Sequence, residues 1–374
     1  MVEICSSDEW RPAAERALEF AQHQVRGLIE SEPDLYPMYT EGGRWRHGKE
    51  AWTHWCDGFL PGMMWIFAKK TRDPFWYEAA ERYTTPLKER KFDRDVHDLG
   101  FIFFSTYHRW HELRSDPELD AVVIEAGRTL AKRFNEKGEY LSSFMGPASI
   151  FIDIMANVGI VAYAAQQTGD AELLDIAVKH CLTTRKRLVR GDGSCAHEGI
   201  FDTETGEFLR QSTQQGYRPD SCWSRGLAWA IYGFTSMYQA TKDPRFLETA
   251  RSCANYYILR TPADGVPLMD YDFPPDVEQR KESSAAAIAA AGLFRLAQAV
   301  PHPAQSALYD GIARRIVMTL SAPPYLATAM PGWEGILTEG VYHLDKNLGV
   351  GESVMWGEYF FCEALDRALE RVAP

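Results

Sequence analysis

Two aspartates at the edges of apolar segments are the strongest candidates for catalysis. Asp153 lies in residues 150–155 (IFIDIM), which are otherwise apolar. Burial of a carboxylate there costs on the order of several kcal/mol unless it is paired or used, and desolvation is expected to raise its pKa toward that of a general acid. Asp98 follows His97 and precedes an apolar run, so it is expected to cap a helix while facing the site. A purely structural role for either carboxylate stays open.

An aromatic ring and a guanidinium occur together in residues 221–234 (SCWSRGLAWAIYGF). With Ser221 as the N-cap, Trp223 and Arg225 fall in the first helical turn, where backbone N–H groups lack partners. Arginine binds carboxylates through two parallel hydrogen bonds, and an aromatic face suits the apolar face of a sugar. The pair therefore predicts an acidic sugar as the ligand. The alternative is a capped core helix whose arginine is solvated.

Further candidates stand at the starts of other apolar segments or in long loops: Trp55, His97, Phe144, His197, Gln215 and Tyr342. Aromatic, amide, imidazole and carboxyl groups together are typical of a carbohydrate site rather than of a lipid or nucleotide site. His108 and His111 are three residues apart, but they fall near an expected helix C-terminus, where such side chains are favoured without a metal. No glycine-rich phosphate loop follows an expected strand, so neither a metal nor a cofactor is predicted.

The composition limits the partners of the chain. It has 374 residues and a formal net charge of −12, which provides no basic excess for nucleic acid or an anionic membrane surface. We find no run of membrane-spanning length and no apolar leader, and the seven cysteines are scattered. These features predict a cytoplasmic protein that acts on a small acidic molecule. They leave the oligomeric state open.

A short motif recurs between apolar and more polar segments. Its copies are residues 71–76 (TRDPFW), 168–173 (TGDAEL) and 241–246 (TKDPRF), with a looser copy at 115–119 (SDPEL). In each copy an aspartate can serve as the N-cap of a following helix, and proline is tolerated at the first helical position. Repeated helical hairpins of this kind indicate a solenoid or a closed toroid.

The expected helices form six pairs, with the more apolar member of each pair inside the ring. The inner helices are expected at 57–70, 98–113, 150–167, 221–240, 283–300 and 353–372, and the outer ones at 74–91, 117–135, 171–189, 244–259, 303–320 and 9–30. Short strands are expected in loops at 139–141, 206–210 and 341–344. Because the inner-to-outer connections are short, the long loops gather at one mouth. The sequence predicts an all-α (α/α)6 barrel in a single domain, residues 1–374, with its site at that mouth.

Residues 223–233 (WSRGLAWAIYG) resemble the signature of the unsaturated glucuronyl hydrolases, glycoside hydrolase family 88. Residues 55–59 (WCDGF), 97–101 (HDLGF), 342–343 (YH) and 356–359 (WGEY) match it as well, as do Asp153, His197 and Gln215. The resemblance implies an (α/α)6 barrel. It also implies a substrate whose non-reducing end is the Δ4,5-unsaturated uronic acid left by polysaccharide lyases.

The resemblance further implies a role for each candidate. The residue at Asp153 protonates C4 of the vinyl ether and assists water at C5, and the residue at Asp98 supports it. Trp55 and Trp223 are then expected to stack on the sugar, with hydrogen bonds from His97, His197, Gln215 and Tyr342. Arg225 is expected to hold the carboxylate.

Several departures from the family pattern lie at the mouth. Phe144 stands where a tryptophan is expected, and the loop that follows it is shorter. Gln214-Gln215-Gly216 replaces His-Gln-Gly, and Gly226-Leu227-Ala228-Trp229 replaces Gly-Gln-Ala-Trp. They leave the linkage and the aglycone open. The alternatives are a related unsaturated rhamnogalacturonyl hydrolase, a sugar epimerase that uses His97 and His197 on opposite faces of the ring, and a non-catalytic sugar-binding toroid.

Overall fold

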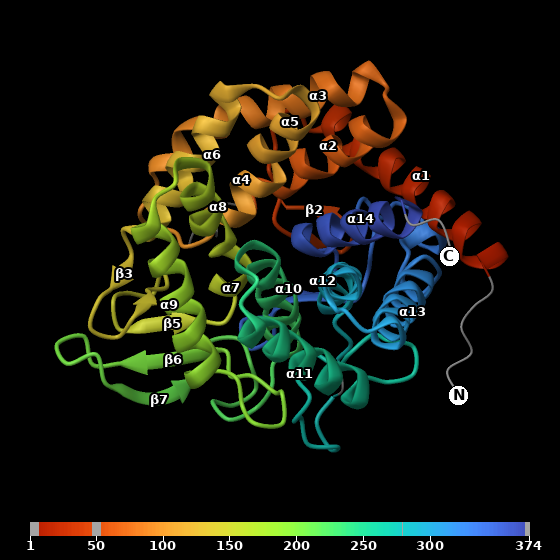
Figure 1. Ribbon diagram of the computed structural model, residues 1–374. Helices are drawn as coiled ribbons and strands as arrows, with labels where there is room; N and C mark the ends of the chain where they lie inside the picture. Colours follow the sequence, from red (N-terminus) through yellow and green to blue (C-terminus); the bar gives the residue numbers. More distant parts are fainter. Residues whose placement is uncertain (1–6, 47–53, 279, 371–374) are drawn as a thin grey trace.

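The computed structural model describes residues 7–46, 54–278 and 280–370, and its helices form a closed ring (Figure 1). The inner helices are α2 (Phe59–Thr71), α4 (Leu99–Ser105) with α5 (Tyr107–Arg114), α7 (Ile154–Asn157) with α8 (Gly159–Thr168), α10 (Ser224–Thr241), α12 (Ser283–Ala299) and α14 (Met355–Glu370). Helix α14 packs against both α12 and α2, so the last helix of the chain closes the ring onto its first hairpin.

A second set of helices covers the outside of this ring. Its members are α1 (Ser7–Ser31), α3 (Pro74–Thr84), α6 (Pro117–Ala131), α9 (Ala171–Arg187), α11 (Pro244–Arg260) and α13 (Pro303–Leu320). Each packs on an inner helix, and α1 packs on α14 across the chain ends. The inner helices supply the large apolar side chains of the core, as their composition indicates. The predicted (α/α)6 architecture is confirmed.

The recurring turn has the same geometry at each copy. The residue before the aspartate is left-handed, with φ of 57° at Arg72, 55° at Ser115, 71° at Gly169 and 59° at Lys242. This conformation ends the inner helix. The aspartates Asp73, Asp116, Asp170 and Asp243 then cap the outer helices, because their side chains accept backbone N–H groups of the first helical turn.

Three of the predicted helices are interrupted in the structure, and the last residues of a fourth, 117–135, belong to strand β3 (Phe134–Asn135). Residues 150–167 do not form one helix, because strand β5 (Ser149–Phe151) precedes α7 and a short irregularity separates α7 from α8. The segment 98–113 breaks at Thr106, which has φ −115° and ψ −93°. The segment 74–91 ends its α-helix at Thr84 and continues as a 3₁₀ helix, η1 (Thr85–Phe92). Apolar runs of this length suit a buried strand as well as a helix, so periodicity alone does not separate them.

Small antiparallel sheets lie in the long outer-to-inner connections. The largest joins β5, β6 (Glu198–Phe201) and β7 (Phe208–Ser212), and β8 (Gly340–His343) pairs with β9 (Leu348–Glu352). The hairpins β1 (Thr40–Glu41) with β2 (Arg44–Trp45), and β3 (Phe134–Asn135) with β4 (Tyr140–Leu141), are shorter. The three predicted strands correspond to β4, β7 and β8, each shifted by one or two residues.

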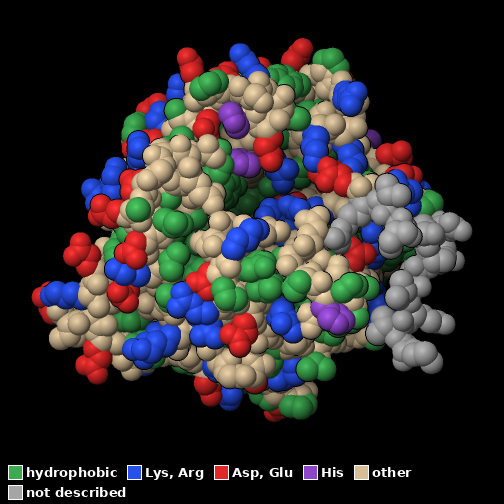
Figure 2. Space-filling model, in the orientation of Figure 1, with side chains coloured by type: hydrophobic (Ala, Val, Ile, Leu, Met, Phe, Trp, Pro, Cys, Tyr) green, Lys and Arg blue, Asp and Glu red, His purple; other side chains and the backbone are tan. Residues whose placement is uncertain are grey.

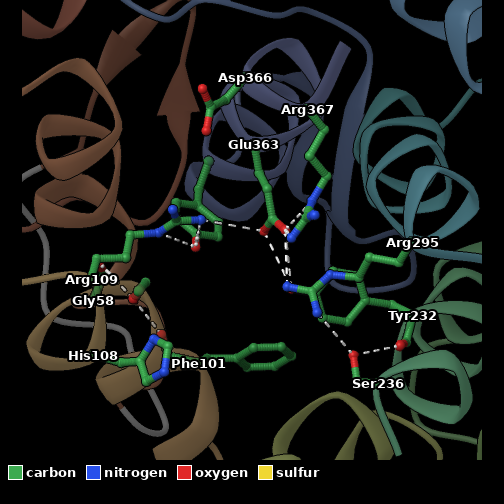
Figure 3. A network of polar contacts seen from close by, with 12 residues as sticks. Gly58, Phe101, His108, Arg109, Tyr232, Ser236, Arg295, Glu363, Asp366 and Arg367 are labelled. Carbon is green, nitrogen blue, oxygen red and sulfur yellow. Dashed lines mark hydrogen bonds and ion pairs between the residues drawn. The ribbon is translucent and has the colours of Figure 1, made fainter. Parts of the chain in front are cut away.

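Polar side chains gather where the inner helices end. Glu363 of α14 is 3% exposed there and contacts Arg367 at 2.8 Å and Arg295 at 3.3 Å, with Arg109 at 3.7 Å (Figure 3). Cations at this end offset the partial negative charge of the helix C-termini. Figure 2 views the same end and shows a hollow near its centre, bordered by acidic, basic and histidine side chains. None of the helices within the described ranges is long and apolar enough to cross a membrane.

Candidate active site

A cavity of about 400 Å³ lies at the other end of the ring. Nine of the ten residues predicted from the sequence line it: Trp55, His97, Asp98, Phe144, Asp153, Gln215, Trp223, Arg225 and Tyr342. They come from segments far apart in the chain: just before α2, α4 and α7, at the start of α10, from β8, and from the loops that follow β4 and β7. The mouth of the ring therefore brings together the side chains that the sequence singled out.

Both candidate carboxylates stand at helix starts without capping them. Asp98 precedes α4 and Asp153 precedes α7, and neither side chain accepts a backbone N–H of its helix. Antiparallel pairing of β5 with β6 fixes the chain immediately before Asp153, and the Ile152 N–H donates to the carbonyl of His197. The two carboxylates therefore lie at helix N-termini, but their oxygens accept no hydrogen bond from the helix backbone.

His97 lies between the two carboxylates. Its Nε2 is 3.3 Å from Asp153 Oδ1 and 3.5 Å from Asp98 Oδ1. Its Nδ1 accepts the backbone N–H of Phe144 at 2.9 Å, and the two rings stack with centroids 5.7 Å apart. Because Nδ1 is an acceptor, the ring proton resides on Nε2 and faces the carboxylates.

The environment moves the pKa values of the two carboxyl groups in opposite directions. Burial raises the pKa of Asp98 to about 6; neighbouring His97 lowers it and the charge of Asp153 raises it. Burial also raises the pKa of Asp153, but the hydrogen bond and charge of His97, followed by His197 and Arg225, outweigh burial and lower it overall. Desolvation acts in the predicted direction, but the predicted net rise of the Asp153 pKa is wrong. Of the pair, Asp98 is the one that holds a proton more readily.

Aromatic rings form the walls and floor of the cavity. Trp55 packs 4.8 Å from Trp356 and 5.8 Å from Phe101, and Phe101 packs 4.7 Å from Trp229. Trp229 and Phe101 line the cavity, and Phe360 lies beneath them, 5.1 Å from Trp229. The barrel is thus closed below the site by stacked rings, leaving an apolar floor with polar groups around it, which suits a sugar ring.

The model of Glycosyl Hydrolase Family 88 matches residues 35–267. The chain belongs to glycosyl hydrolase family 88. It is 31% identical over 350 residues to the unsaturated glucuronyl hydrolase of Bacillus sp. GL1, covering 90% of this chain and 92% of the relative. The crystal structure of that protein superposes with a TM-score of 0.87 at 29% identity, over 95% of this chain and 96% of the other.

Two streptococcal relatives extend the comparison. The chain is 30% identical to the unsaturated chondroitin disaccharide hydrolase of Streptococcus pneumoniae, over 84% of this chain and 82% of the relative. A mutant unsaturated glucuronyl hydrolase of Streptococcus agalactiae, complexed with dGlcA-GalNAc6S, superposes with a TM-score of 0.82 at 28% identity, covering 96% and 92% of the two chains. The predicted family, fold and unsaturated glucuronyl hydrolase activity are confirmed.

Arg225 makes its hydrogen bonds to acceptors within the protein. Its side chain is 2% exposed, and Nη1 donates to Glu282 Oε2 and the Val341 carbonyl, both at 2.5 Å. Nη2 donates to Gln215 Oε1 at 2.5 Å and to the Tyr342 carbonyl at 3.0 Å. All four terminal N–H groups therefore have acceptors within the protein. The guanidinium is thus an internal anchor of the cavity wall, and a grip of Arg225 on the substrate carboxylate stays a prediction.

His197 is the one predicted residue that does not line the cavity. Its ring is 2% exposed and lies 4.6 Å from both Phe151 and Trp223, and burial lowers its pKa to about 4. Its Nδ1 accepts the N–H groups of Gln214 at 3.1 Å and Gln215 at 3.3 Å. His197 therefore supports the wall behind the site. The pair of histidines on opposite faces that an epimerase needs is not formed.

The structure adds residues to the cavity that were not among the predicted site residues: Phe101, Met145, Phe151, Gln214, Trp229, His343 and Lys346. Gln214 and His343 stand out in the sequence as polar residues in long loops. Lys346 has no comparable signal except its position in a mouth loop next to Tyr342. No group of His, Cys, Asp or Glu side chains in the described part of the chain is arranged to hold a metal ion.

Proposed function

We propose that this chain, as a single catalytic domain in the cytoplasm, removes the Δ4,5-unsaturated uronic acid from lyase-generated acidic oligosaccharides by hydrating its vinyl ether. The arrangement of Asp98, His97 and Asp153 around an aromatic cavity carries this proposal. The six cysteines within the described residues are free and buried, which supports a reducing compartment. Cys5 lies outside the described residues.

In the proposed reaction Asp153 is the acid and then the base. A uronate carboxylate entering the cavity brings a negative charge close to Asp153 and raises its pKa, so that Asp153 takes up a proton. Asp153 gives this proton to C4, and the resulting carboxylate accepts a proton from the water whose oxygen bonds to C5. One water is consumed. The product is a hemiketal that rearranges and releases the rest of the oligosaccharide.

The neighbouring groups assist this step without reacting. Asp98 and the Nε2–H of His97 keep a shared proton close to Asp153. Trp55 supplies a half-buried aromatic face, and Gln215 and Tyr342 supply polar contacts from the walls. Arg225 and Lys346 are the two Lys or Arg side chains that line the cavity among the described residues. Since the donors of Arg225 are engaged, we assign the attraction of the substrate carboxylate to Lys346.

The relatives guide the choice of substrate. One acts on unsaturated chondroitin disaccharides and another was solved with dGlcA-GalNAc6S. We therefore propose glycosaminoglycan-derived unsaturated disaccharides as the substrate class. The related rhamnogalacturonyl hydrolase reaction is the second candidate, because Phe144 and Gln214 alter the mouth of the site.

The ultraviolet absorbance of the conjugated C4=C5 carboxylate tests the proposal. Wild type and Asp153→Asn are incubated with unsaturated chondroitin, heparin and pectin disaccharides. We expect loss of absorbance with wild type on glycosaminoglycan disaccharides, and a decrease of about 10³-fold or more in Asp153→Asn, with the circular dichroism spectrum unchanged. Turnover of pectic disaccharides alone would favour the second candidate. Near-normal activity in a folded Asp153→Asn would remove Asp153 from the mechanism.

A further inference from the structure

We propose that Glu282, which does not line the cavity, is a positioning residue: by anchoring Arg225 it holds Gln215 and Tyr342 in the substrate-binding wall and compensates the positive charge that Arg225 exerts on Asp153. This inference rests on the proposed function. It concerns how the site is built rather than which groups react.

Glu282 is fully buried and uses both carboxylate oxygens. Its Oε1 accepts the N–H and the hydroxyl of Ser284, at 3.1 and 2.7 Å, and the N–H of Val341 at 3.3 Å. Its Oε2 accepts Nη1 of Arg225 at 2.5 Å. One carboxylate therefore connects the start of α12, strand β8 and helix α10. Ser284 alone would satisfy a helix cap, so the contacts to β8 and α10 exceed what capping requires.

Arg225 connects Glu282 to the residues of the cavity wall. Its Nη2 fixes Gln215 through Oε1, which leaves the amide N–H groups of Gln215 as the donors available to a ligand. The same guanidinium binds the carbonyls of Val341 and Tyr342. It also lies between two rings, 4.4 Å from Trp223 and 5.2 Å from Trp356. Loss of its counter-ion would thus release several cavity-lining groups together.

The pair also sets the charge around the reacting carboxylate. The titratable groups that act on Asp153 are His97 and Asp98 from the segment before α4, His197 from the segment before β6, and Arg225 from α10. The negative charge of Glu282 compensates Arg225. Without that compensation the full charge of Arg225 would stabilise ionised Asp153 and oppose its protonation.

The test compares Glu282→Gln with a matched control at the other end of the ring. Glu363→Gln also removes a buried, arginine-bound carboxylate, but Glu363 lies in the network of Figure 3, below the aromatic floor. We expect both variants to lower the melting temperature. Glu282→Gln should raise KM about tenfold, lower kcat/KM about 100-fold and move the pH optimum about one unit toward acid. Glu363→Gln should leave KM and kcat within about twofold of wild type and the pH optimum unchanged.

Two further variants keep the test decisive if Glu282→Gln fails to fold. Glu282→Asp retains the charge and should keep the wild-type pH optimum. The double variant Arg225→Met with Glu282→Met removes both charges, so it should fold and recover the pH optimum but not KM, since Gln215 has lost its anchor. If the double variant changes stability as Glu363→Gln does but keeps the wild-type KM, or if Glu282→Asp moves the pH optimum although the charge is retained, the positioning role is overturned.

A binding measurement separates this inference from the proposed reaction. Calorimetry with an unsaturated chondroitin disaccharide on the Asp153→Asn background should show about tenfold weaker binding when Glu282→Gln is added. If wild type binds the disaccharide but does not turn it over, the proposed reaction fails while the binding comparison still decides the role of Glu282. Equal binding with and without Glu282→Gln overturns the positioning role, and absence of binding to the Asp153→Asn parent overturns both.

Discussion

Nε2 of His97 lies 3.3 Å from Oδ1 of Asp153, while Nδ1 of the same ring accepts the N–H of Phe144 at 2.9 Å. The backbone of one mouth loop thereby selects the tautomer that presents a proton to Asp153. Oδ1 of Asp98 lies 3.5 Å from the same nitrogen. The site is consequently a coupled group of two carboxyls and one imidazole, and its titration belongs to the group rather than to Asp153 alone.

The activity should depend on pH through the protonated form of this group. Burial raises the pKa of Asp98 to about 6, whereas the pKa of Asp153 is lowered. The shared proton is present below pH 6 and is lost as the pH rises through 6. We therefore expect kcat/KM to be highest on the acidic side and to fall about tenfold per pH unit well above 6. The absorbance assay, run over a range of pH values, measures this fall in kcat/KM.

Asp98→Asn tests whether the fall in kcat/KM above pH 6 depends on Asp98. The substitution retains the size of the side chain but removes its proton exchange, so the residual activity should no longer fall with a midpoint near pH 6. A profile that is flat to pH 8 in wild type would contradict the coupled arrangement.

Much of the ring was predictable because its signals are local. A residue in the left-handed conformation followed by a capping aspartate recurs at Asp73, Asp116, Asp170 and Asp243, and each turn depends on a few adjacent residues. Helix α13 has the bounds that the proline at 303 and the apolar periodicity indicate. The placement of polar residues at helix starts likewise follows from short inner-to-outer turns, which leave the long loops at one end.

What was missed depends on contacts between distant segments. Ile150 belongs to β5 because β6, nearly fifty residues later, supplies its hydrogen-bond partner, and no local pattern records that pairing. The hydrogen bonds that Arg225 makes within the protein depend on Glu282, which lies 57 residues away in the sequence. The lowered pKa of Asp153 follows from His97 in another loop. An apolar neighbourhood in the sequence therefore predicts burial but not which polar partner offsets it.

The capping aspartates should stabilise the ring without affecting catalysis. Asp170 accepts the N–H groups of Glu172 and Leu173 at 3.0 and 3.2 Å, at the end of the ring away from the cavity. We expect Asp170→Ala to lower the free energy of unfolding by about 1 kcal/mol in urea denaturation, with kcat and KM unchanged. Asp175→Ala, an exposed position on the same helix paired with Lys179, serves as the control and should cost no more than about 0.5 kcal/mol. An equal decrease in the free energy of unfolding in the two variants would show that Asp170 does not stabilise the helix as a cap.

The network around Glu363 should make the ring sensitive to acid. Burial raises the pKa of Glu363, but Arg367, Arg295 and Arg109 together lower it from 4.5 to about 2 (Figure 3). The unfolded chain binds this proton near pH 4.5, whereas the folded chain resists it until about pH 2. The contribution to stability is therefore fully present above pH 4.5 and is lost as the pH falls toward 2, by about 3 kcal/mol in total.

Urea denaturation between pH 3 and 7 measures this dependence. Glu363→Gln should be less stable than wild type at pH 7, and the difference should shrink as the pH falls, because wild type loses the ionised carboxylate that the variant already lacks. Glu370→Gln is the control, since it removes a half-exposed carboxylate of the same helix that contacts Lys69. Its effect should stay within about 1 kcal/mol across the range. A constant difference between wild type and Glu363→Gln from pH 7 to 3 would show that Glu363 acts by packing rather than by its charge among the arginines.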